Sequence, residues 1–101
     1  MKDQKSNRLY VLISNKLPSI YGAVQGGHAV AQWMLEHHND LKWKNETVIY
    51  LSCNIEQMLY KLNGDDISIF HEPDLGNEIT AIAVLGNHYN EPVLKKLRLL
   101  Q

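Results

Sequence analysis

Apolar runs and amphipathic segments follow one another along the chain. Leu9–Ile13 is a continuous apolar run, Ile67–His71 alternates apolar and polar residues, and Ile79–Leu85 is almost wholly apolar. Together with Thr47–Ser52, these lengths and their β-branched residues predict four strands. The last of them is expected to be buried on both faces, because it has almost no polar side to present to water.

Three other segments have the features of helices. In Tyr21–His38 the apolar residues recur on one side at 100° per residue, which predicts a long amphipathic helix. Asn54 is predicted to cap a short helix over 55–63, with Gly64 as its stop. A last helix is predicted over 91–100, capped by Asn90.

The resulting order is β-α-β-α-β-β-α. Strands that are separated by helices imply parallel pairing, and the directly joined last two strands imply an antiparallel pair. We therefore predict an α/β fold with a four-stranded mixed sheet and helices on both faces. The 101 residues suit a single domain over 1–101, with residues 1–8 as a polar N-terminal tail.

Charge and composition narrow the function classes. Ten Lys and Arg against eleven Asp and Glu give a net charge of −1, which argues against nucleic-acid binding through bulk electrostatics. The single cysteine, Cys53, excludes a multi-cysteine metal site and is expected to be a buried apolar residue. The polar N-terminus and the lack of a stretch of ~20 apolar residues predict a cytoplasmic protein without a membrane span.

The predicted long helix carries a polar stripe on an otherwise apolar segment, formed by Tyr21, Gln25, His28 and Gln32. The stripe begins just after the first strand, and ligands of open α/β sheets bind at the carboxyl ends of strands. His28 would then be a general base or hydrogen-bond donor, and Gln25 would orient a substrate. The alternative is that the stripe is the solvated edge of the helix.

A second candidate region is the loop 72–78, which follows a strand end and contains the carboxylates of Glu72, Asp74 and Glu78. Neighbouring carboxylates can shift one another's pKa and so create an acid–base site. Thr80, the polar residue of the apolar strand that follows, needs a hydrogen-bond partner if it is buried. The alternative is an ordinary solvated turn.

Together the two regions resemble one known family. The run Ala23–Ala29 (Ala-Val-Gln-Gly-Gly-His-Ala) is similar to the Ala-Ala-Gln-x-x-His-Ala helix start of type II peptidyl-tRNA hydrolases. The run Glu72–Ala83 resembles the loop and last strand of bacterial and phage members. The order of elements agrees from about Leu9 to Leu100. The resemblance implies a three-layer α/β/α fold with strand order 2-1-4-3, strand 4 antiparallel, and a homodimer.

The resemblance also implies an activity: hydrolysis of the ester between a peptide and the 3′-terminal ribose of tRNA, with no metal and no cofactor. By this reading His28 acts at the site together with a carboxylate, Glu72 or Asp74, that polarises or positions a water. Thr80 would complete the catalytic set from the last strand. The implied partner is peptidyl-tRNA.

The substrate-binding residues that follow from the resemblance lie mostly on the same helix. Gln25 contacts the substrate, and the backbone amides of Gly26 and Gly27, at the helix start, face the developing oxyanion. Tyr21 stands where family members place a lysine, four residues before the glutamine. Lys16 is the basic residue that remains in this neighbourhood.

The tyrosine at the lysine position keeps a second function open. A non-catalytic binding module on the same fold would hold a protein or small ligand in a cleft at Tyr21, Trp43 and Asp74. A third possibility is a hydrolase or transferase that acts on another substrate.

Overall fold

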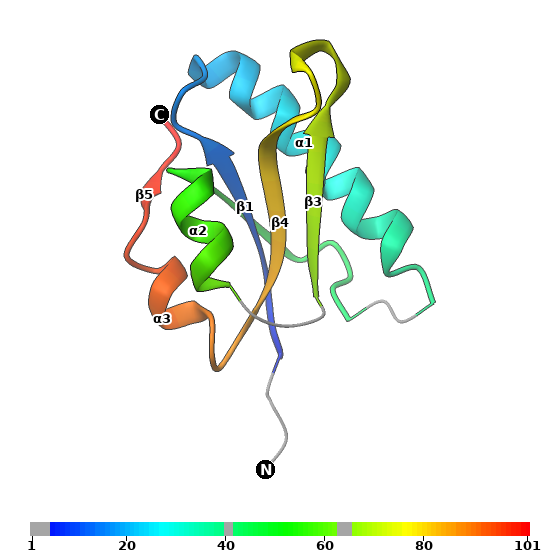
Figure 1. The fold of residues 1–101 in the computed structure, drawn as a ribbon. Coiled ribbons are helices and arrows are strands. Elements are labelled where there is room, and N and C mark those ends of the chain that lie inside the picture. Colours follow the sequence, from blue (N-terminus) through cyan, green and yellow to red (C-terminus); the bar gives the residue numbers. More distant parts are fainter. Residues whose placement is uncertain (1–4, 40–41, 63–65) are drawn as a thin grey trace.

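The computed structural model describes residues 5–39, 42–62 and 66–101 and has the predicted α/β architecture (Figure 1). A mixed sheet of five strands runs in the order β3-β4-β1-β2-β5. The strands are β1 (Lys5–Ser14), β2 (Thr47–Cys53), β3 (Ile67–Glu72), β4 (Glu78–Asn87) and β5 (Arg98–Leu99).

The pairing directions agree with the sequence argument. Strand β1 pairs in parallel with β2 and antiparallel with β4, and β3 is antiparallel to β4. The neighbour relations 2-1-4-3 are therefore present. The predicted number of four strands is wrong, because β5 adds a short antiparallel strand beside β2.

The added strand replaces most of the predicted last helix. Helix α3 covers only Glu91–Leu94, and Arg98–Leu99 then forms β5. The Leu100 N–H donates to the Tyr50 carbonyl at 3.0 Å, so this segment satisfies backbone groups along the edge of β2. Pairing with an open sheet edge thus outweighs the helical apolar spacing of this segment.

The N-terminal prediction is also partly wrong. Residues 5–8, expected in a polar tail, belong to β1, where Lys5 pairs with Asn87 and Arg8 with Thr47. Backbone pairing does not require apolar side chains, so a polar segment can extend a strand. Residues 1–4, Asn63 and Gly64, for which a tail, a helix end and a helix stop were predicted, lie outside the described residues.

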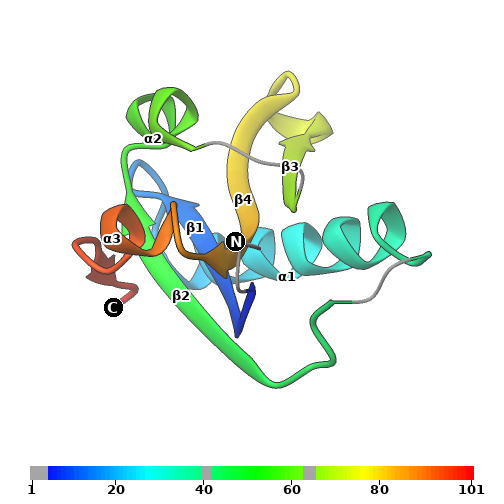
Figure 2. The ribbon, with the colours of Figure 1, turned by 90° about the horizontal axis from the view of Figure 1, so that it is seen from below.

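Helices cover both faces of the sheet, in three layers (Figure 2). Helix α1 (Ser19–Glu36) packs on the face that receives Val11 and Ile13 of β1. The opposite face receives Leu12 and is covered by α2 (Ile55–Lys61) and α3. Alternate residues of β1 therefore feed two separate apolar cores. In the described part of the chain, no helix is long and apolar enough to cross a membrane.

Two glycines allow α1 to lie close to the sheet. A Cβ on Gly22 would lie 2.6 Å from Ile13 Cγ2, and one on Gly26 would lie 2.7 Å from Tyr50 Cε2. Such distances leave no room for a methyl group. The close approach brings the inner side of α1 within hydrogen-bond reach of β3 and β4, where the candidate site lies.

Candidate functional site

A buried chain of hydrogen bonds joins α1 to β3 and β4. The Thr80 hydroxyl donates to Gln25 Oε1 at 2.6 Å, and Gln25 Nε2 donates to Glu72 Oε1 at 2.9 Å. Thr80 is 0% exposed, Gln25 1% and Glu72 8%. The directions form one relay that ends on the carboxylate, so we call it the Thr80–Gln25–Glu72 chain.

The connection between β3 and β4 fixes the position of the carboxylate. Glu72 ends β3, and its Oε2 accepts a hydrogen bond from the Asp74 N–H at 3.3 Å at the start of the 3₁₀ helix η1 (Pro73–Leu75). Gly76 and Asn77 then adopt φ values of 63° and 62°, a left-handed conformation that suits these two residue types. The Asn77 N–H donates to the Glu72 carbonyl at 2.8 Å, which closes the turn.

These hydrogen bonds keep Glu72 ionised. Donation from Gln25, and then from the Asp74 N–H, lowers the pKa of the Glu72 carboxyl, and His28 and Tyr21 lower it further. Together these effects outweigh burial, which raises the pKa. The site therefore presents a carboxylate that is held by protein donors and has a small part of its surface open to solvent.

Tyr21 and His28 flank this carboxylate from the same helix. Partial burial raises the pKa of the Tyr21 hydroxyl, and the charges of Glu72 and Asp74 raise it further, so the phenol stays protonated and can donate. The exposed His28 ring stacks on Phe70 of β3, with centroids 4.7 Å apart and an interplanar angle of 7°. The stack fixes the plane of the imidazole beside the end of β3.

The structure places some of the predicted site residues in direct contact with one another, and it places others only in their neighbourhood. Glu72, Gln25 and Thr80 are bonded to one another, while the Asp74 side chain is exposed and its backbone N–H makes the contact. Over the described ranges, no hydrogen bond directly joins His28, Asp74 and Thr80 to one another. The carboxylate in the chain is Glu72.

The expected helix-start position of the two glycines is wrong. Helix α1 begins at Ser19, so Gly26 and Gly27 lie in its interior, where each N–H is directed along the helix to the carbonyl four residues back. Those amides are not free to face an oxyanion. Gly26 packs against Tyr50 and Ile13, whereas Gly27 faces open space.

Trp43 also lies away from the expected binding cleft. It is 2% exposed, its indole packs edge-on against Trp33 with centroids 6.2 Å apart, and its N–H donates to the Thr47 carbonyl at 3.1 Å. The residue belongs to the core under α1. A lone aromatic residue in a polar loop gave no sequence signal of burial.

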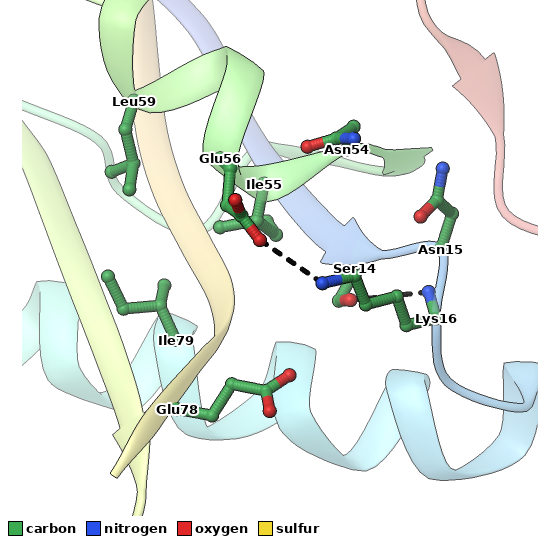
Figure 3. A pocket seen from close by; sticks show the side chains of 9 residues that line it. All are labelled: Ser14, Asn15, Lys16, Asn54, Ile55, Glu56, Leu59, Glu78 and Ile79. Atoms are coloured by element: carbon green, nitrogen blue, oxygen red, sulfur yellow. Dashed lines mark hydrogen bonds and ion pairs between the residues drawn. The ribbon is translucent and has the colours of Figure 1, made fainter.

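Lys16 borders a neighbouring cleft that sequence reasoning missed. Its Nζ lies 3.1 Å from Glu56 Oε1 (Figure 3). The cleft has a volume of about 250 Å³ and opens where β1 and β2 end and β4 begins, beside α2. We call it the α2 cleft. The available signal was that Asn15 and Asn54 directly follow strand ends, the usual ligand edge of an α/β sheet.

The comparison with protein-family models gave no match to this chain, and the comparison with curated proteins gave none either. An ionised carboxylate beside an imidazole and a protonated phenol can position a water, accept its proton and donate to a developing negative charge.

Proposed function

We propose that this protein hydrolyses the ester that links a peptide to the 3′-terminal ribose of tRNA, without a metal or cofactor. One observation carries the proposal. The two segments that resemble type II peptidyl-tRNA hydrolases are joined by the Thr80–Gln25–Glu72 chain, although Gln25 and Glu72 lie 47 positions apart in the sequence. His28 and Tyr21 both lower the pKa of the same carboxyl.

In the proposed reaction, a water attacks the ester carbonyl carbon and the bond to the ribose oxygen breaks. His28 accepts the proton of the water and returns it to the ribose oxygen, and the peptide leaves with a carboxylate. Glu72, ionised and held by Gln25, orients the water or the imidazole by accepting a hydrogen bond. The Tyr21 phenol donates to the oxygen that becomes negative.

The first experiment measures release of tRNA from an N-acetylated aminoacyl-tRNA by the purified protein. His28→Ala should lower kcat/KM by about 10²-fold, which is typical for loss of a general base. His38→Ala is the matched control, because His38 is an exposed histidine that lies two residues beyond the C-terminal end of α1, whereas His28 lies in the middle of the helix. Absence of turnover above buffer would refute the activity, and full activity in His28→Ala would refute the site.

A non-catalytic binding module is the second candidate. It is favoured by the position of Lys16, which is paired with Glu56 in the α2 cleft, while Tyr21 occupies the lysine position of the family. In that case the protein retains a specific ligand or protein partner at the Glu72 carboxylate and turns over no ester. Loss of that partner in Tyr21→Ala, with no hydrolysis in the wild type, would favour this candidate.

The proposal includes a cytoplasmic homodimer, as the resemblance implies. The outward side of α1 supports it, because Ile20, Val24, Ala31 and Leu35 are exposed and the helix has no charged residue before Glu36. A second copy would cover this uncharged stripe. Light scattering should give a dimer for the wild type and a monomer for Ala31→Glu. A monomeric wild type would contradict this part of the proposal.

A further inference from the structure

The α2 cleft has walls of two kinds. Ile55 and Leu59 of α2 and Ile79 of β4 line it with apolar surface, and Leu59 is 37% exposed. The Lys16–Glu56 ion pair closes one side, and Glu78 projects along another (Figure 3). The cleft therefore combines an apolar wall with hydrogen-bond donors and acceptors at its mouth, as small-ligand sites do.

The size of the cleft restricts what it can hold. Its volume of about 250 Å³ lies below the range of roughly 300–1,000 Å³ that is usual for drug-sized ligands. One amino-acid residue fits this volume better than a nucleotide or a folded peptide. The apolar wall favours an aliphatic side chain, and the polar rim suits the amide groups on either side of it.

The cleft adjoins the candidate site through one strand pair. Glu78, which lines the cleft, is the register partner of Glu72 across β3 and β4. Side chains directly opposite in an antiparallel pair have Cβ atoms about 5 Å apart. The cleft and the Glu72 carboxylate therefore lie at the same end of the β3–β4 strand pair, with Glu78 on the rim of the cleft.

We infer that the α2 cleft binds an apolar amino-acid residue of an acylated chain, the residue whose carbonyl is esterified to the ribose. This assignment rests on the proposed hydrolase function and adds its acyl specificity. The aliphatic side chain lies against Leu59 and Ile79. Lys16, which uses one of its three donors on Glu56, donates a second to the amide oxygen of the acyl chain.

Binding is tested without any turnover. N-acetyl-L-leucinamide, titrated into the full-length protein, should shift the methyl NMR signals of Ile55 and Ile79 in a saturable manner, and N-acetylglycinamide should not. Leu59→Trp fills the cleft and should abolish the shifts. Tyr60→Trp is the matched control, because Tyr60 is the next residue of α2 and is 92% exposed, away from the cleft.

Measurements of turnover test whether the cleft takes part in the reaction. The kcat/KM for hydrolysis of N-acetyl-leucyl-tRNA should be about tenfold higher than that for N-acetyl-glycyl-tRNA. This factor is at the low end of the discrimination that an apolar pocket provides for one added group, because this cleft is open. Leu59→Trp should remove the difference and Tyr60→Trp should keep it. If leucyl and glycyl substrates react equally although the probe binds, the assignment to the esterified residue is wrong.

The two proposals can fail separately. Absence of saturable shifts, or unchanged shifts in Leu59→Trp, overturns the cleft assignment while hydrolysis of tRNA esters can still be observed. Saturable binding of N-acetyl-L-leucinamide with no hydrolysis of either substrate overturns the hydrolase function and leaves the cleft as a site for an apolar amino-acid residue.

Discussion

Thr80 offers a direct test of the buried hydrogen-bond chain, because two substitutions separate its hydroxyl from its methyl group. Thr80→Val keeps the shape and removes the donor to Gln25 Oε1. Thr80→Ser keeps the donor and removes the methyl group. Thr80 is fully buried, so water cannot replace the lost donor without a rearrangement.

The two losses differ in size. A buried acceptor left without its donor costs about 1–3 kcal/mol, so Thr80→Val should lower the free energy of unfolding by that amount. Removal of one buried methyl group costs about 0.8 kcal/mol from hydrophobic transfer alone. Thr80→Val is therefore expected to be the less stable variant, although valine is the more apolar residue in an apolar strand.

The assay is urea unfolding followed by fluorescence of Trp33 and Trp43, which pack against each other under α1. With a slope of about 1–3 kcal/mol per molar urea, a loss of ~2 kcal/mol lowers the midpoint by roughly 1 M. The slopes of the variants must agree for the comparison to hold. A Thr80→Val protein as stable as the wild type, with Thr80→Ser less stable, would refute the reasoning.

Three further predictions concern neighbouring features. Gly27→Ala should raise stability by about 1 kcal/mol through helix propensity, whereas Gly26→Ala should lower it by ~1–3 kcal/mol through overpacking; equal effects in thermal unfolding would contradict the packing of α1. Burial raises the pKa of the Cys53 thiol to about 11, so Ellman's reagent at about pH 8 should label it only on unfolding, and rapid native labelling would disprove this. Because the folded-state pKa of Glu72 is below its ordinary value of 4.5, the ionised side chain stabilises the folded protein at pH values above 4.5. This stability is lost as the pH falls through the folded-state pKa. Gln25→Met removes the largest cause, so urea midpoints at about pH 5 and about pH 3 should differ less than in the wild type, and an unchanged difference would count against this cause.

The long apolar runs predict strands of the sheet correctly, because the need to bury such a run is enough to specify a strand. Leu9–Ile13 and Ile79–Leu85 fall within β1 and β4. The helical connection from β1 to β2 predicts their parallel pairing, and the short connection from β3 to β4 predicts an antiparallel pair. The strand β5 has no such pattern. Its two residues pair because the edge of β2 offers backbone groups for hydrogen bonding. The residue types of Arg98–Leu99 do not predict this pairing.

The site was predictable as a set of residues and not as an arrangement. The helical stripe and the carboxylate loop single out Gln25 and Glu72 separately. Their contact depends on how closely α1 approaches the sheet, which is set by the missing side chains at Gly22 and Gly26. Lys16 was assigned to the same site by its distance along the chain, yet its partner is Glu56 on α2, 40 residues away.

The chemistry of the buried chain bears on why it is there at all. Apolar residues of similar shape at Gln25, Glu72 and Thr80 would join α1 to the sheet without the cost of desolvating polar groups, so stability alone does not require them. Instead, Gln25 Nε2 and the Asp74 N–H both donate to the Glu72 carboxylate, which keeps a small exposed surface near His28 and Tyr21. Glu72 also has a structural role, because it caps η1 by accepting from the Asp74 N–H, but that role does not need the neighbouring His28 and Tyr21. This is the physical ground for treating the chain as support for a reactive site and for expecting the largest functional effects at its exposed end.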